Sequence, residues 1–190
     1  PDLASLLEAF ANEHQLRYEV STVDEDQYKL TIIGKSAHGS TPEAGINGAT
    51  YLALFLNQFD FGGDAKAYLQ VSASLLHEDF DGEKLGIAHT DEKMGALSMN
   101  AGVFNFDENS SDNTIALNIR YPKGTDPETI KAGLEKVEGV ASVSLSAHGH
   151  TPHYVPMEDE LVSTLLRVYE KQTGLKGHEQ VIGGGTFGRL

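Results

Sequence analysis

The sequence contains no cysteine among its 190 residues. Without thiols the chain forms no disulfide, offers no thiolate nucleophile and builds no cysteine-ligated zinc site. Basic residues are also scarce, since 14 lysines and arginines stand against 28 aspartates and glutamates, for a net charge of −14. No basic stripe is available to neutralise phosphates, and the composition therefore argues against nucleic acid and anionic membrane surfaces as partners.

Long hydrophobic runs are missing as well. No segment approaches the roughly 18 apolar residues needed to span a bilayer, and no signal peptide opens the chain. With 39% hydrophobic residues and a mean hydropathy of −0.29, the composition predicts a soluble globular protein with a cytoplasmic location. The first residue is Pro1 rather than methionine, and the last residues read GGGTFGRL, so we expect a fragment of a longer protein.

Hydrophobic periodicity predicts helices that alternate with pairs of strands along the first 150 residues. The expected helices cover 2–16, 41–62, 65–77 and 126–137, and the second and fourth open with a capping residue followed by proline, Thr41-Pro42 and Asp126-Pro127. The expected strands cover 17–22, 28–34, 95–108, 114–122 and 141–150. This order indicates an α+β fold, with antiparallel sheets and helices packed on one face.

A change in composition predicts a domain boundary. The stretch HGHTPHYVP, residues 148–156, is rich in proline and histidine and is typical of a linker. Residues 1–150 are then one domain. Residues 151–190 contain one expected helix, 158–174, and one short expected strand, 179–182, which cannot bury a core alone. We expect them to be an incomplete segment of a second domain.

The stretch GKSAHGSTPEAGINGATYLALFL, residues 34–56, places His38 among small residues between a strand and a proline-capped helix. Small neighbours leave the imidazole accessible, and loops at the ends of rigid elements are where binding groups sit. The same residues also suit an ordinary surface histidine in a turn, and residue types alone do not decide between the two. Asn47, near the end of the loop, is expected to stabilise its entry into the helix.

Four motifs together resemble a known family. Residues 34–56 resemble the lid-domain signature of the M20-type zinc metallopeptidases, the aminoacylase/carboxypeptidase superfamily. Within that family, NIRYPKGTDPETI, PHYVPMEDELVSTLLRVYEKQTG and VIGGGTFGR resemble the bacterial Xaa-His dipeptidases, which cleave beta-Ala-His and other dipeptides. The resemblance implies a ferredoxin-like lid over residues 1–150, of the type through which many members form homodimers. Residues 151–190 would belong to the zinc catalytic domain.

The resemblance also implies roles for particular residues. His38 corresponds to the lid histidine that stabilises the tetrahedral oxyanion, a contribution typically worth about 3 kcal/mol. Arg120 corresponds to the arginine that binds the substrate's C-terminal carboxylate, which suits a guanidinium because it forms two parallel hydrogen bonds. Gly184, Gly185 and Thr186 correspond to a loop that lines the substrate pocket. Without the family, the arginine would be a surface residue and the glycine run a turn.

The resemblance places the ligands of the family's two zinc ions, and its general base, outside this chain. We therefore expect no bound metal and no hydrolysis from the chain alone, since the reaction needs metal-activated water and a base. Three groups of metal-ligating residue types do occur in the sequence: His77–Asp79, His89–Asp91 and the histidines of HGHTPH, 148–153. They lack the family's other carboxylates, and we do not interpret them as zinc sites.

Two functions stay open at this point. The first is the lid of a dizinc dipeptidase that hydrolyses dipeptides by metal-activated water. The second is a non-catalytic ligand-binding or dimerisation module, because a fold alone does not fix a function. The positions of His38 and Arg120 discriminate between them, since a catalytic lid needs both residues at one cleft.

Overall fold

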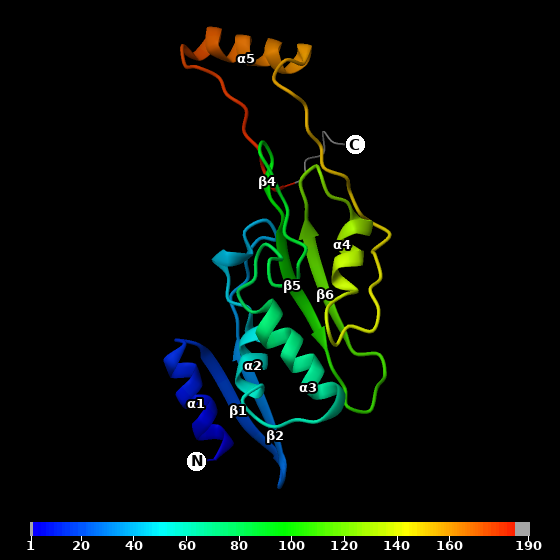
Figure 1. Cartoon of the computed structure of the whole chain (residues 1–190). Helices are drawn as coiled ribbons and strands as arrows, with labels where there is room; N and C mark the ends of the chain where they lie inside the picture. Colours follow the sequence, from blue (N-terminus) through cyan, green and yellow to red (C-terminus); the bar gives the residue numbers. More distant parts are fainter. Residues whose placement is uncertain (1, 185–190) are drawn as a thin grey trace.

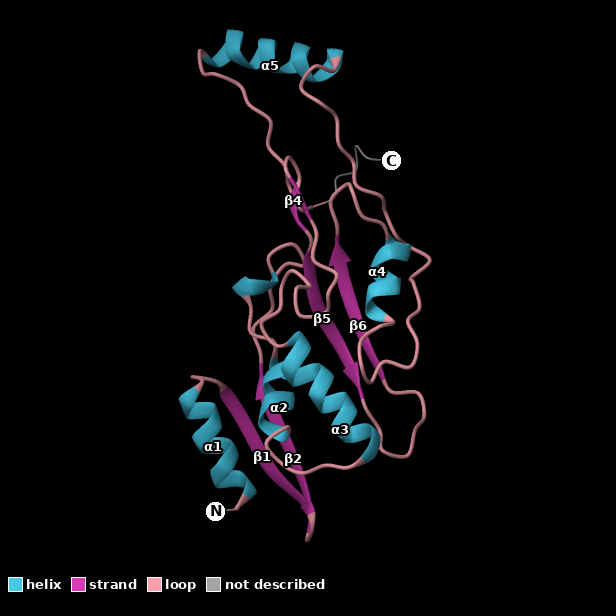
Figure 2. Ribbon diagram, in the orientation of Figure 1, coloured by secondary structure: helices cyan, strands magenta, loops and turns pink. Residues whose placement is uncertain are grey.

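The computed structural model describes residues 2–184, in which strands pair two by two and helices pack beside them (Figure 1; Figure 2). The elements are α1 (Leu3–Glu13), β1 (Arg17–Asp24), β2 (Gln27–Ile33), η1 (Pro42–Ala44), α2 (Gly48–Leu56), α3 (Gly63–Gln70), η2 (Val71–Leu76), β3 (Thr90–Asp91), β4 (Gly95–Ala96), β5 (Ser98–Asn105), β6 (Thr114–Arg120), α4 (Pro127–Leu134) and α5 (Glu160–Thr173). The pairs β1–β2, β3–β4 and β5–β6 are all antiparallel. The α+β class is confirmed.

One hydrophobic core joins α1, the β1–β2 hairpin and α2. Asp2 caps α1 as predicted, because its carboxylate accepts a hydrogen bond of 2.8 Å from the backbone N–H of Ser5. The apolar spacing of α1 then turns one face of the helix toward β2 and α2. The buried members of this core are Leu7, Phe10, Ala11, Leu16, Ile32 and Phe55.

The second core lies between the β5–β6 pair, η2 and α4. Side chains alternate between the two faces of a strand, so each face of this sheet has its own character. One face is apolar and packs into the second core. The buried residues of this core are Val71, Leu76, Leu85, Ile87, Leu97, Met99, Ala101 and Ile130. The opposite face carries two polar cross-strand pairs, Ser98 with Arg120 and Asn100 with Asn118. This polar face positions the site described below.

The helix expected from Thr41 does not form as one element. Pro42 opens only the short 3-10 turn η1, and the side chain of Thr41 makes no capping hydrogen bond. Helix α2 begins six residues later at Gly48, where Asn47 is the capping residue. A proline in a first turn is compatible with either kind of helix, and the better cap decided where the α-helix starts. The expected role of Asn47 at the helix entry is confirmed.

Two expected strands are absent from the described residues, and one small hairpin was not foreseen. Residues 141–150 and 179–182 have no regular secondary structure and form no ladder with another strand. Alternating side chains make a segment suitable for a sheet, but a strand also needs a partner for its backbone groups. The β3–β4 hairpin was not foreseen as a separate pair: β4 falls within the expected strand 95–108, and β3 has only two residues, too few to show a period.

Helix α5 stands apart from both cores, joined to them by two long connections (Figure 1). It has a good cap, since the Asp159 carboxylate accepts from Leu161 N and Val162 N, but it has no buried residue. The predicted helix 158–174 is therefore present, while the division of the chain at residue 150 stays a prediction. Within residues 2–184 no helix has the length and apolar character needed to cross a membrane.

Asn47 connects the two cores, and replacing it tests that connection. Its Oδ1 accepts from Thr50 N at 3.2 Å, and its Nδ2 donates to the Ala101 carbonyl at 2.7 Å. Asn47→Asp keeps the cap but sets a carboxylate oxygen against that carbonyl, so we expect a loss of about 2 kcal/mol in unfolding free energy. Urea denaturation measures it.

The reverse exchange at another cap is the matched control. Asp126 caps α4 through a 2.7 Å bond from Thr129 N. Asp126→Asn keeps this acceptor, so its cost should stay below about 1 kcal/mol. Equal losses for the two variants would show that Asn47 acts only as a cap.

Candidate functional site

The loop that carries His38 is closed at its base by a two-way backbone pairing. Lys35 N donates to Ile46 O at 3.0 Å, and Ile46 N donates to Lys35 O at 2.9 Å. Glycines allow this close approach, because a Cβ atom at Gly34 would lie 2.4 Å from Ile46 O and one at Gly45 would lie 2.6 Å from Lys35 O. The loop thus projects from rigid elements with His38 exposed on it.

Within the loop the imidazole of His38 is held by Ser40. The Nδ1 atom lies 2.7 Å from Ser40 Oγ, and it also accepts a hydrogen bond of 3.2 Å from the backbone N–H of Ser40. Among residues 2–184, no hydrogen-bond partner is found for Nε2. One edge of the ring is therefore fixed to the protein and the other is available to a ligand.

Arg120 lies directly against this loop. It ends β6, on the polar face of the β5–β6 sheet, opposite Ser98. A Cβ atom at Gly39 would lie 3.6 Å from both Nε and Nη2 of the guanidinium and 3.5 Å from Asn118 Oδ1. The residue that follows His38 thus touches Arg120. The structure thus places the loop that carries His38 beside Arg120, which is 82 positions further along the chain than His38.

Gly183, the first residue of the glycine run, contacts both Arg120 and the loop that carries His38. Arg120 Nη1 donates a hydrogen bond to the carbonyl oxygen of Gly183. A Cβ atom at Gly183 would lie 2.7 Å from Ser40 Cβ, closer than real side-chain contacts, so glycine is needed for this approach. Gly184 follows as an exposed residue with open space around its Cα. Gly185 and Thr186, the other two predicted pocket residues, lie outside the described residues.

The guanidinium of Arg120 is incompletely satisfied. Its Nε atom is buried, and among residues 2–184 no acceptor lies within hydrogen-bond range of it. A buried donor without a partner costs about 1–3 kcal/mol, and such a group in a native structure calls for a physical explanation. Gly39 lies against the Nε and Nη2 edge, so a carboxylate would reach this missing acceptor position only after a shift of the His38 loop.

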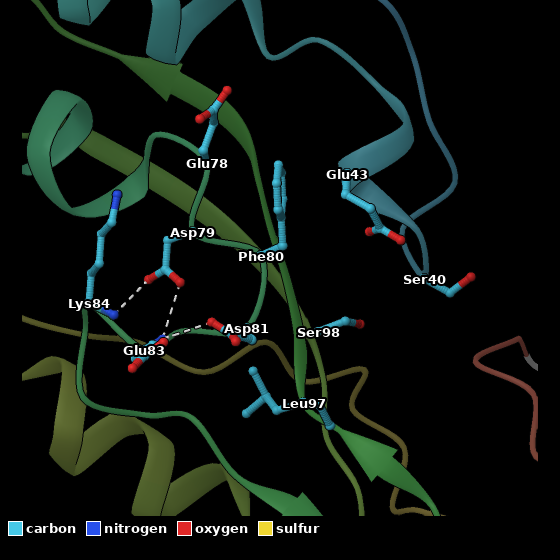
Figure 3. Close-up of a pocket in the computed structure, with 11 residues that line it drawn as sticks. Ser40, Glu43, Glu78, Asp79, Phe80, Asp81, Glu83, Lys84, Leu97 and Ser98 are labelled. Carbon is cyan, nitrogen blue, oxygen red and sulfur yellow. Dashed lines mark hydrogen bonds between the residues drawn. The ribbon is translucent and has the colours of Figure 1, made fainter.

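A cavity of about 410 Å³ opens beside Ser40 (Figure 3). Ser40 and Glu43 lie on one side of it, and the segment from Glu78 to Lys84 lies on the other, with Leu97 and Ser98 between them. Most charged groups of the lining are carboxylates. The cavity beside Ser40 is therefore a region of negative charge.

The segment on the far side of the cavity is organised by Asp79. Its buried carboxylate accepts from three backbone N–H groups, Gly82 and Glu83 at 3.1 Å and Lys84 at 3.0 Å. Burial raises the pKa of Asp79, and the neighbouring Asp81 carboxylate adds to this effect, while the backbone N–H donors of Lys84 and Glu83 oppose it. Asp79 thus shapes a loop and is not free to bind a ligand.

The histidines of the two groups His77–Asp79 and His89–Asp91 are also hydrogen-bonded to neighbouring groups of the protein. His77 Nδ1 lies 3.1 Å from Thr50 Oγ1, and His89 Nε2 lies 3.2 Å from Lys123 O. Asp91 accepts from the backbone N–H groups of Lys93 and Met94. Among residues 2–184 no group of three or more histidines and carboxylates could hold a metal ion. These residues do not fit a zinc site, and no chemical step is assigned to a metal bound by them.

The partly buried side chain of His77 should make the stability of the fold depend on pH. Burial lowers the pKa of His77, partly offset by the neighbouring Glu78 carboxylate. The folded chain therefore binds this proton less readily than the unfolded chain, whose histidine titrates near about 6.5. Unfolding free energy should fall as pH drops below that value, toward the lower pKa of the folded state.

Urea denaturation at about pH 7.5 and pH 5.5, on either side of the ordinary histidine value, measures this loss. His77→Gln should lose less stability over that interval than the unmodified chain. His148→Gln is the control, since His148 is exposed and should leave the pH dependence unchanged. If His77→Gln retained the full loss, the pH dependence would have to arise elsewhere.

The sequence of the chain is similar to those of several bacterial proteins. No family model matches the chain. It is 46% identical over 194 residues, 100% of its length, to a protein of Lactobacillus delbrueckii subsp. lactis named "Beta-Ala-Xaa dipeptidase". It is 33% identical over 189 residues to a protein of Staphylococcus epidermidis, and 32% over 192 residues to one of Staphylococcus saprophyticus, both named "Putative dipeptidase". The chain is similar to dipeptidases along its whole length.

The chain matches less than half of the length of each of these relatives. The chain spans 41% of the Lactobacillus protein and 40% of each of the two Staphylococcus proteins. Their names accordingly describe proteins more than twice as long as the matched region. The roles of His38, Arg120 and Gly184 stay predictions.

Two polar residues of the site were not singled out from the sequence. Ser40 contacts the His38 ring, and Asn118 lies beside Arg120 under the loop. A hydroxyl two residues after a histidine was a usable signal, because such short spacings allow a side chain to bond its neighbour's ring or backbone. For Asn118 the signal was strand alternation, since residues two apart share a face.

Proposed function

We propose that the chain is the substrate-binding lid of a dipeptidase. In this proposal Arg120 binds the C-terminal carboxylate of a dipeptide, and His38 stabilises the oxyanion that forms at its carbonyl. The observation that carries the proposal is the meeting of the His38 loop, Arg120 and Gly183 at one place. Similarity along the whole chain to proteins named as dipeptidases supports the same function.

Arg120 suits a carboxylate for geometric reasons. Its Nη1 is occupied by the Gly183 carbonyl, while its Nε lacks an acceptor among residues 2–184. In this proposal the His38 loop shifts from the Nε and Nη2 edge, which Gly39 now covers, and a carboxylate takes two parallel, charge-assisted hydrogen bonds there. Lysine could not reproduce this fork. The requirement for a free carboxylate makes the end of a peptide the preferred ligand.

His38 suits an oxyanion for chemical reasons. Its Nδ1 is engaged by Ser40, so Nε2 is the nitrogen that can donate to a substrate. A donor held in place before the reaction stabilises negative charge better than one that must reorganise. Because Gly39, the residue after His38, lies beside Arg120, we propose that both side chains act on one substrate, and that this substrate is a dipeptide.

We further propose that the whole protein is a zinc-dependent enzyme of the M20 type, with two metal ions held by residues outside this chain. When bound, such ions supply an activated water for hydrolysis. The residues of this chain have the complementary tasks: Arg120 holds the carboxylate, and His38 donates to the oxygen on which negative charge develops. The lid is proposed to comprise residues 1–150, with residues 151–190 belonging to the catalytic domain.

A peptidase assay on the whole protein tests the proposal. Beta-Ala-His and other free dipeptides should be hydrolysed, while their C-terminal amides should react with kcat/KM lower by about 100-fold, because charged hydrogen bonds are lost. Chelation should abolish the activity and zinc should restore it. The 190-residue chain on its own should not hydrolyse either substrate.

Two results would contradict the proposal. Equal hydrolysis of free and amidated dipeptides would remove the carboxylate-binding role of Arg120. Binding of dipeptides without hydrolysis by the whole, zinc-loaded protein would instead favour a non-catalytic binding module.

A further inference from the structure

The contact between Ser40 and His38 determines more than the position of the ring. A backbone N–H can only donate, and the backbone N–H of Ser40 donates to Nδ1 of His38 at 3.2 Å. Nδ1 must therefore offer a lone pair. In a neutral imidazole only one nitrogen carries a proton, so that proton lies on Nε2.

The Ser40 hydroxyl fits the same arrangement. Its oxygen lies 2.7 Å from Nδ1, and a hydroxyl can rotate to donate as well as to accept. If Nδ1 carried the proton, it could donate to Oγ, but the backbone N–H of Ser40 would then point at a protonated nitrogen. An unprotonated Nδ1 has one lone pair, so it accepts mainly from the closer hydroxyl and shares that lone pair with the backbone N–H.

The backbone around Ser40 holds this geometry in place. Thr41 N donates to His38 O at 2.9 Å, which closes a turn over residues 38–41. On its other side, Gly183 approaches Ser40 so closely that any larger residue there would meet its Cβ. Ser40 thus lies between the histidine and the segment that accepts a hydrogen bond from Arg120.

We propose that Ser40 is a positioning residue that holds His38 as the neutral tautomer with its proton on Nε2. The Nε2–H group is then directed to a ligand as a donor, without any need for the ring to be charged. The structural half of this inference concerns the chain alone. Its catalytic half rests on the proposed dipeptidase function and deepens it.

Nitrogen NMR on the 190-residue chain tests the structural half. At a pH where the ring is neutral, long-range proton–nitrogen spectra distinguish a protonated ring nitrogen from an unprotonated one, and His38→Asn identifies the His38 signals by their loss. We expect an unprotonated Nδ1 and a protonated Nε2. Ser40→Ala removes the hydroxyl contact but keeps the backbone N–H, so it should move the signals part of the way toward the other tautomer, and Ser40→Thr should restore them.

Ser36→Ala is the matched control. Ser36 lies two residues before His38 and is exposed, and no side-chain hydrogen bond is found for it among residues 2–184. The same loss of a hydroxyl at this position should leave the His38 signals unchanged. A protonated Nδ1 in the unmodified chain, or an unchanged tautomer in Ser40→Ala, would overturn the inference.

Kinetics of the whole protein test the catalytic half. Ser40→Ala should lower kcat about 5- to 10-fold, the effect of losing one hydrogen bond, with little change in KM. Ser40→Thr should recover most of it. If the whole protein lacked dipeptidase activity, the proposed function would fail while the NMR result still decided the tautomer. An active enzyme whose Ser40→Ala variant kept full kcat would instead overturn the catalytic half alone.

Discussion

Replacing His38 with alanine in the whole protein is expected to lower kcat for dipeptides by about 10²- to 10³-fold, the usual effect of removing one oxyanion donor. KM should change little, because the oxyanion exists only in the transition state and its intermediate. Steady-state kinetics with a free dipeptide measure both constants. His38→Gln should retain part of the activity, since its amide can still donate a hydrogen bond.

The control for this prediction is an exposed histidine far along the chain. His178 lies after α5 and is exposed, so His178→Ala should keep both constants near those of the unmodified enzyme. A rise in KM at constant kcat in His38→Ala would show that His38 binds the ground state of the substrate. That outcome would contradict the oxyanion role and leave a role in binding.

Replacing Arg120 with lysine should lower kcat/KM for free dipeptides by about 100-fold, because the charge remains but the two parallel hydrogen bonds do not. The effect should appear mainly in KM. A dipeptide amide supplies the decisive comparison, since it has no carboxylate for Arg120 to bind. The enzyme and the variant should therefore hydrolyse the amide at similar rates.

Arg17→Lys is the matched control for this exchange. Arg17 is exposed at the start of β1, and its replacement should leave the kinetics of both substrates unchanged. If Arg120→Lys lowered the rates for the free dipeptide and its amide alike, Arg120 would be holding the site together through Gly183. It would then not be recognising the carboxylate.

The elements that sequence predicted well are those with both a local signal and a local partner. Asp2 begins α1 where a cap was expected, and β1 with β2 forms the expected hairpin. Segment 141–150 had the alternation of a strand but has no ladder among the described residues. A local pattern cannot tell whether a partner strand is present, because pairing is a property of the whole fold.

In the candidate site, too, local features could be predicted from the sequence, whereas contacts between distant residues could not. Small residues around His38 predicted an exposed ring, and the structure has one. Nothing in the local spacing indicated that Gly39 would touch Arg120, which is far along the chain. Only the family resemblance brought the two together beforehand. The bond between Ser40 and His38 could have been expected, but its consequence for the tautomer depends on the direction of a backbone N–H.

Helix α5, which has no buried side chain, has a consequence for handling the chain in the laboratory. Isolated helices shorter than about 12–15 residues are marginal in water, and α5 has 14 residues with no core of its own. Its amides should exchange with deuterated solvent much faster than those of α1 or β5. A protease should accordingly cut within residues 158–174 first and release a shortened product that retains both cores. Binding of any partner surface to the apolar side of this helix should slow the exchange of its amides.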